Sequence, residues 1–98
     1  MRFADLTLDA ATREAWRGTR QIRLTRTEFA ILECLMRASG RVVPRDTLIE
    51  EVWGEREVTH NNLEVFIRFL RTKLDGAGCP SLIHTERGLG YRLRSPEP

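Results

Sequence analysis

The sequence has few of the residues that build metal centres and covalent catalytic sites. Its 98 residues include two cysteines and two histidines. Cys34 and Cys79 are far apart and form no C-x-x-C pair, so the ligand spacing of a typical zinc site is absent. We therefore expect two free thiols in a reducing compartment, with no metal and no cofactor.

Long apolar runs are also missing. No segment approaches the roughly 18 apolar residues that cross a bilayer. The first residues lack the apolar core of a signal peptide as well. These two absences predict a cytoplasmic protein that does not contact a membrane.

A strong charge of one sign is the third feature that the sequence lacks. The net charge of +2 is too small to indicate nucleic-acid binding by itself. Its distribution is more informative, because residues 1–58 hold ten Lys/Arg and ten Asp/Glu, whereas residues 59–98 hold six and four. The basic excess therefore lies in the last two-fifths of the chain.

The first half of the sequence predicts a small sheet followed by a core helix. Residues 1–24 alternate weakly between apolar and polar, which favours three or four short antiparallel strands, with Trp16 in the contact between sheet and helix. Such a sheet needs a helix against one face. Thr25 and Glu28 form a capping-box pattern that predicts a helix to about Ser39, ended by Gly40 at C′.

The second half predicts two more helices and a hairpin. Pro44 is typical of a first helical position, after a brief extended link at residues 42–43, and Thr59 is a plausible N-cap for a third helix over residues 61–74. Residues 82–94 read as a β-hairpin in which Gly88 and Gly90 supply positive φ. The expected fold class is α+β, a winged helix-turn-helix with an N-terminal sheet (1–24), three helices (25–74) and a wing (82–94).

The third predicted helix has two unlike faces. Four apolar residues form one stripe at helical spacing: Leu63, Ile67, Leu70 and Leu74. On the opposite side and its flanks lie Asn61, Glu64, Val65, Arg68, Phe69, Arg71 and Thr72. This face suits base edges and phosphates, although the helix alone favours the interpretation of an ordinary solvated surface.

Five motifs resemble the C-terminal DNA-binding domain of OmpR/PhoB-type response regulators. They are LTRTEF at 24–29, GRVV at 40–43, VWG at 52–54, IRFLRTKL at 67–74 and TERGLGYRL at 85–93. Their order, together with the N-terminal sheet, extends the resemblance over essentially the whole chain. We therefore expect residues 1–98 to form a single domain of this type.

The resemblance implies sequence-specific binding of double-stranded DNA, at tandem repeats, by a transcriptional regulator with a receiver domain upstream. It implies a third helix in the major groove and a wing at the backbone or minor groove. The implied DNA-binding residues are Asn61, Asn62, Glu64, Val65, Arg68, Phe69, Arg71, Thr72, Thr85, Arg87, Gly88 and Tyr91. A loop that can contact RNA polymerase corresponds to Glu55, Arg56, Glu57 and Val58.

The chain departs from the family pattern at three positions. Phe66 and Phe69 stand where His and a second Arg are common, and Glu86 stands where Val is common. On the helical wheel Phe66 lies nearer the apolar stripe and favours the core. Phe69 lies nearer the polar face, where contact with DNA and packing against a neighbour both remain open.

The sequence also bears on two other function classes, an enzyme and a protein-binding module. The G-x-G at Gly88 and Gly90 precedes a strand, whereas a phosphate-binding loop follows a strand and opens a helix, so it indicates a turn. No nucleophile and base are paired in the sequence, and we predict no enzyme and no catalytic residue. The alternative function is a winged-helix module that binds only protein.

Overall fold

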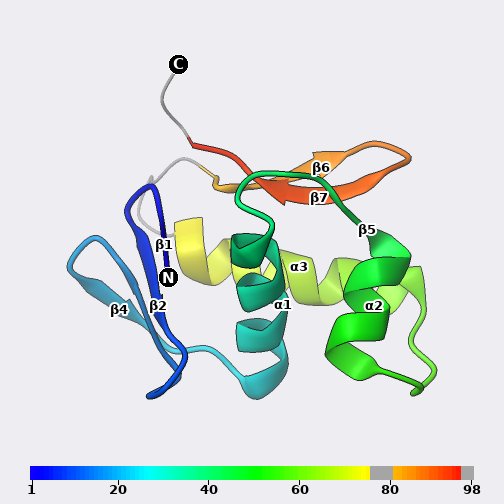
Figure 1. Cartoon of the computed structure of the whole chain (residues 1–98), viewed down its shortest axis with the longest axis horizontal. Coiled ribbons are helices and arrows are strands. Elements are labelled where there is room, and N and C mark those ends of the chain that lie inside the picture. Colours follow the sequence, from blue (N-terminus) through cyan, green and yellow to red (C-terminus); the bar gives the residue numbers. More distant parts are fainter. Residues whose placement is uncertain (76–80, 96–98) are drawn as a thin grey trace.

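Strands occupy both ends of the chain, and helices connect them. The computed structural model describes residues 1–75 and 81–95, in which four strands precede α1 and one short strand lies between α1 and α2 (Figure 1). Two more strands follow α3. The N-terminal sheet and the C-terminal hairpin lie on different sides of the helices, which confirms the α+β winged helix-turn-helix architecture.

The N-terminal sheet is antiparallel, in the order β1-β2-β3-β4. Its strands are β1 (Arg2–Phe3), β2 (Leu6–Asp9), β3 (Glu14–Arg17) and β4 (Arg20–Ile22). In β3 the buried residues are Ala15 and Arg17, and Trp16 lies between them on the opposite, half-exposed face. The predicted role of Trp16 in the core contact is therefore wrong, because alternation along the strand gives that face to Ala15.

Helix α1 (Arg26–Arg37) begins as its sequence predicts. The Glu28 amide donates to Thr25 Oγ1 at 3.2 Å, and Glu28 Oε1 accepts from the Thr25 amide at 2.9 Å, which completes the capping box. The end differs from the prediction, since Ala38 is the C-cap and Ser39, with φ of 51°, occupies C′. Gly40 follows one position later with φ of 91°.

Helices α2 (Arg45–Trp53) and α3 (His60–Asp75) form the rest of the helical layer. Pro44 is the N-cap of α2 rather than its first helical residue. At the start of α3, Thr59 Oγ1 accepts from the Asn62 amide at 3.1 Å, which is the contact expected of an N-cap. Within the described residues no helix is long and apolar enough to span a bilayer.

The second sheet joins segments that are distant in sequence. It has the order β5-β7-β6, with β5 (Val43–Pro44), β6 (Ile83–Glu86) and β7 (Gly90–Leu93). Val43, predicted only as part of a brief link at residues 42–43, thus forms with Pro44 an edge strand that pairs with β7. We call the β6–β7 hairpin, residues 83–93, the wing.

The two wing glycines serve different needs. Gly88 has φ of 77°, as a tight turn requires. Gly90 does not have positive φ, contrary to the sequence prediction. A Cβ at Gly90 would lie 2.0 Å from the Val43 carbonyl oxygen, so this position needs glycine because β5 approaches it closely.

A single core runs between the two sheets and the helices. It includes Leu6 and Leu8 from the first sheet, Leu32 and Leu35 from α1, and the apolar stripe of α3. Leu82, Ile83 and Leu93 extend it beneath the wing. Helices α1 and α2 pack against α3, and the buried stripe of α3 belongs to this core.

Candidate nucleic-acid interface

Burial separates the two faces of α3 as the helical wheel predicts. Leu63, Ile67, Leu70 and Leu74 are fully buried. The exposed positions are Asn61, Asn62, Glu64, Arg68, Phe69 and Thr72, with Val65 and Arg71 half-buried. The apolar stripe holds α3 in place, and the hydrogen-bonding side chains on the other face of the helix remain open to solvent.

Arg68 borders a small cavity between α3 and the wing. The cavity measures about 210 Å³ and is lined by Glu64, Ile67, Arg68, Arg71, Thr85 and Tyr91. The structure thus brings three exposed predicted residues, Glu64, Arg68 and Thr85, to one junction. Thr72 lies on the same helix, where its hydroxyl donates to the Arg68 carbonyl at 3.0 Å.

Arg71 makes two contacts within the protein. Its Nε donates to the Ile83 carbonyl at 3.1 Å, and its Nη2 donates to Thr85 Oγ1 at 2.8 Å. Both acceptors belong to β6, so Arg71 ties α3 to the wing. The wheel places Arg71 correctly at the flank of the exposed face, but it cannot show this partner, which is 12 to 14 residues away.

The wing tip is exposed. Arg87 and Gly88 are open to solvent, and Leu89 is 63% exposed. The negative charge of Glu86 is paired, because its carboxylate lies 3.8 Å from Arg92 Nε. The pairing leaves Arg87 as the exposed cation between Glu86 and the turn glycine.

Tyr91 lies elsewhere than its predicted role requires. The residue is only 2% exposed, and the Arg45 guanidinium lies 5.2 Å from the centroid of its ring. Its side chain belongs to the core under the wing. Because a buried ring offers DNA almost no surface, we remove Tyr91 from the candidate interface.

The two unusual phenylalanines of α3 occupy different environments. Phe66 packs against the core, and its ring centroid lies 5.5 Å from that of Trp53 in α2. The ring centroid of Phe69 lies 6.3 Å from that of Phe66 in an edge-on arrangement, and Phe69 is 48% exposed. Phe69 also borders an apolar hollow of about 540 Å³ beside Thr25 and Lys73. An aromatic series therefore runs from the α2–α3 contact to the exposed face.

The loop between α2 and α3 presents its charges to solvent. Glu55, Arg56 and Glu57 are exposed, whereas Val58 is half-buried. Arg56 Nε donates to the Trp53 carbonyl at 3.3 Å. Nothing in these contacts selects a partner for the loop.

Sequence reasoning missed a second recess beside the wing tip. It measures about 450 Å³, and Arg45, Asp46 and His60 line it together with Gly88 and Leu89. His60 Nε2 lies 2.7 Å from Asp46 Oδ1. These residues start two different helices, so no local pattern in the sequence could have grouped them.

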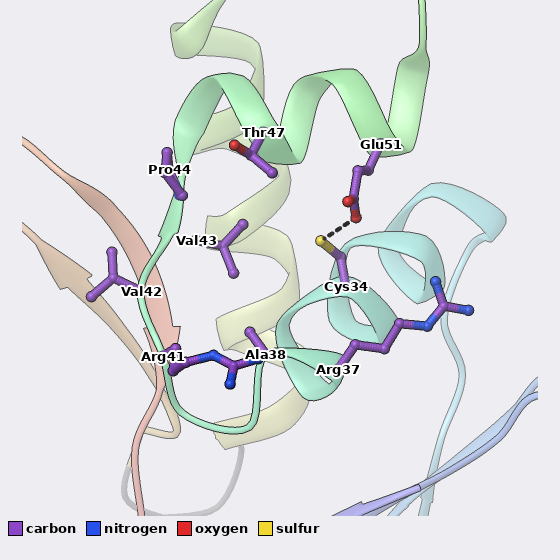
Figure 2. Close-up of a pocket in the computed structure, with 9 residues that line it drawn as sticks. All are labelled: Cys34, Arg37, Ala38, Arg41, Val42, Val43, Pro44, Thr47 and Glu51. Atoms are coloured by element: carbon purple, nitrogen blue, oxygen red, sulfur yellow. Dashed lines mark hydrogen bonds between the residues drawn. The ribbon is translucent and has the colours of Figure 1, made fainter.

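The pocket drawn in Figure 2 contains the buried thiol. Cys34 Sγ donates to Glu51 Oε2 at 3.0 Å, and Arg37 and Arg41 lie at its border. Burial, followed by the hydrogen bond and charge of Glu51, raises the pKa of the Cys34 thiol to about 12. The thiol is therefore protonated at neutral pH and is a poor nucleophile. Cys79 lies outside the described residues.

Residues 1–75 and 81–95 contain no group of three or more His, Cys, Asp or Glu side chains placed to hold a metal ion. The features gathered on one surface are instead those of a docking face. They are an exposed polar helix face, an arginine-tethered hairpin and a basic hairpin tip.

A comparison with known families decides the relationship. The family described as "Transcriptional regulatory protein, C terminal" matches residues 19–93. The chain belongs to this family. This membership confirms the OmpR/PhoB-type resemblance that the five motifs carry.

Relatives of this OmpR/PhoB-type domain are close in sequence. Response regulator MprA of Mycobacterium tuberculosis (strain ATCC 25618 / H37Rv) is 54% identical over 99 aligned positions, which cover 100% of this chain and 43% of MprA. MprA of Mycobacterium sp. (strain KMS) is 55% identical over 97 residues, covering 98% of this chain and 42% of that protein. The chain thus spans less than half the length of these curated relatives.

A solved structure also resembles the whole domain. The Klebsiella pneumoniae RstA DNA-binding domain, determined in complex with the RstA box, is 30% identical with a TM-score of 0.82. The match covers 95% of this chain and 94% of the RstA chain.

Proposed function

We propose that this domain binds double-stranded DNA sequence-specifically, as the effector domain of a transcriptional regulator. Helix α3 enters the major groove, and the wing lies at the backbone or minor groove. The observation that carries the proposal is the exposed face of α3, with Arg68 at its centre, held beside the wing through Arg71. The RstA domain, whose structure contains its DNA box, supports it by similarity.

Some exposed side chains of the proposed surface position the domain on DNA phosphates, and others contact the bases. Guanidinium groups contact phosphates and guanine, and the Asn61 and Asn62 amides can pair with adenine. Arg68 is the principal basic group on the exposed face. Glu64, Val65, Thr72 and Gly88 are also part of the proposed contact surface, together with Thr85 and Arg87 of the wing. In the full-length protein the proposal includes a receiver domain upstream, binding to tandem repeats, and RNA polymerase contact through residues 55–58.

Phe69 gives the surface an apolar contact where the family commonly has a basic one. The thymine methyl group is an apolar feature of the major groove, so we assign Phe69 to a thymine. Replacing thymine by uracil at each position of the bound site tests this assignment. Loss of affinity at one position supports it, and unchanged affinity at every position removes it.

The central experiment is a fluorescence anisotropy titration with a DNA site selected from random sequences by this chain. Affinity should fall steeply between low and moderate salt, because phosphate contacts release counterions. Arg68→Ala should weaken binding about tenfold or more and flatten the salt slope by about one unit. Arg37→Ala removes an exposed charge outside the proposed surface and serves as the control.

The control separates a specific contact from the effect of net charge. If Arg37→Ala weakened binding as much as Arg68→Ala, the assignment of the α3 face would be wrong. If the parent bound no selected DNA even at low salt, the alternative of a protein-binding module would replace this proposal.

A further inference from the structure

Arg71 joins the two elements that the proposed function places on DNA. Strand β6 is an edge strand of the sheet, and Ile83, its first residue, accepts hydrogen bonds from Arg71 at 3.1 Å and from the Ser81 hydroxyl at 3.2 Å. The guanidinium of Arg71 is planar, so its donors to Ile83 and Thr85 are fixed relative to each other. The pair of bonds sets both the distance and the orientation of β6 on α3.

The same contact defines what the Thr85 hydroxyl can do. A hydroxyl has one donor hydrogen and accepts through its oxygen. Thr85 Oγ1 accepts from Arg71 at 2.8 Å, so the hydroxyl hydrogen is left to point away from the guanidinium. Thr85 is exposed, which gives that hydrogen access to a partner outside the protein.

The positive charge of Arg71 also makes the Thr85 hydroxyl a stronger hydrogen-bond donor. Bonds in a chain polarise one another, and a cation donating to an oxygen makes the hydrogen on that oxygen a better donor. The natural acceptor for such a hydrogen on a DNA-binding surface is a phosphate oxygen.

We propose that Arg71 is a positioning residue that acts through Thr85, orienting and polarising its hydroxyl toward one DNA phosphate. This inference rests on the proposed function and goes further by giving Arg71 no direct DNA contact of its own. It replaces the prediction from the helical wheel, in which Arg71 itself bound DNA. Arg68, which lies on the same cavity, keeps the direct role.

The test replaces single phosphates of the selected DNA site with neutral methylphosphonates and measures affinity for five proteins. Thr85→Val removes the hydroxyl and keeps the side-chain shape. Thr85→Ser keeps the hydroxyl and is the conservative control. Arg71→Lys keeps the positive charge but cannot reproduce the planar pair of bonds. The parent and the Thr85→Val, Arg71→Lys double variant complete a cycle.

We expect Thr85→Val to weaken binding about tenfold and to abolish the sensitivity to one methylphosphonate position. Arg71→Lys should abolish sensitivity at the same position, and the double variant should lose about tenfold rather than about a hundredfold. Thr85→Ser should behave like the parent. The salt slope should be nearly unchanged in Arg71→Lys, because the charge remains.

Several outcomes would overturn the inference. Arg71→Lys could remove sensitivity at a phosphate that Thr85→Val leaves intact, or the two losses could multiply, and either result would give Arg71 its own DNA contact. Arg71→Lys could also abolish the sensitivity to methylphosphonates at every phosphate near the wing. That result would mean that Arg71 only holds the wing on α3 and does not orient Thr85 toward one phosphate. Failure of the parent to bind any DNA would instead reject the proposed function, and this inference with it.

Discussion

The two ends of α3 are held in opposite ways. At the C-terminal end, Arg17 donates to the Leu74 carbonyl at 3.0 Å, and Arg20 donates to the carbonyls of Lys73 and Leu74 at 3.1 and 2.8 Å. The Arg17 side chain is only 2% exposed and also pairs with Asp75. These cations satisfy terminal carbonyls and oppose the negative end of the helix dipole.

The N-terminal end is held by small polar contacts at the surface. Thr59 caps the first turn through Asn62, and His60 pairs with Asp46 where both side chains are largely exposed. Asn61 and Glu64 beside them are open to solvent. The C-terminal end of α3 is thus held by arginines of the N-terminal sheet. At the N-terminal end, the polar side chains of Asn61 and Glu64 stay accessible to a binding partner.

The largest expected effect comes from the stripe that underlies both ends. Leu70→Ala should lower the free energy of unfolding by roughly 2 to 5 kcal/mol, because a fully buried leucine leaves a cavity. Arg68→Ala, two positions away on the exposed face, should leave stability nearly unchanged. Urea denaturation of both variants checks this, and equal destabilisation would contradict the separation of the two faces.

The C-terminal anchor is tested by removing its buried cation. Arg17→Ala should cost about 3 kcal/mol, since Asp75 and the Leu74 carbonyl lose a buried partner. Arg20→Ala removes a more exposed arginine from the same carbonyls and should cost about 1 kcal/mol or less. Thermal unfolding of the two variants measures the contrast. Equal costs would mean that burial of Arg17 does not set its contribution.

Glu28 connects the C-terminal anchor to α1, since its carboxylate pairs with Lys73 at 2.5 Å. Burial raises the pKa of the Glu28 carboxyl, but hydrogen bonds from Lys73 and Thr25 outweigh burial, so the net pKa lies below the ordinary value of a glutamate. Glu28→Gln should cost roughly 1.5 to 3 kcal/mol at neutral pH.

The pH dependence follows from the direction of that shift. A carboxyl with a lowered folded-state pKa stabilises the protein above its unfolded value and loses this contribution as pH falls through the folded value. The stability difference between parent and Glu28→Gln should therefore shrink below about pH 4. A difference that stays constant from neutral to acidic pH would exclude the charged pair as its source.

The smallest expected effect concerns the wing, which works beside the free end of α3. Arg87→Ala should not change folding stability, because the side chain is exposed. It should weaken binding most where the selected site has an A·T-rich flank, since narrow minor grooves attract guanidinium groups. The salt slope should fall by up to about one unit. Equal affinities of parent and variant across flanks of different A·T content would place the wing outside the interface.

Local patterns in the sequence were sufficient for most elements. The capping box at Thr25 and Glu28 and the apolar stripe of α3 depend on residues three or four apart, so they can be read without a structure. The helix end at Ser39 was missed because a non-glycine residue there adopts φ of 51°. Strand β5 was missed because two residues cannot show alternation, and their pairing with β7 is not local.

The sequence by itself determined the fold class, the family and the division of α3 into a buried and an exposed face. Helical periodicity and five ordered motifs carry that information. Tertiary structure alone decided that Arg17 and Arg71 bond to partners within the protein, that Tyr91 is buried and that Gly90 must lack a side chain. Each of these depends on an element at least 12 residues away, and burial of a long side chain is set by such distant packing rather than by its own position on a helix or strand.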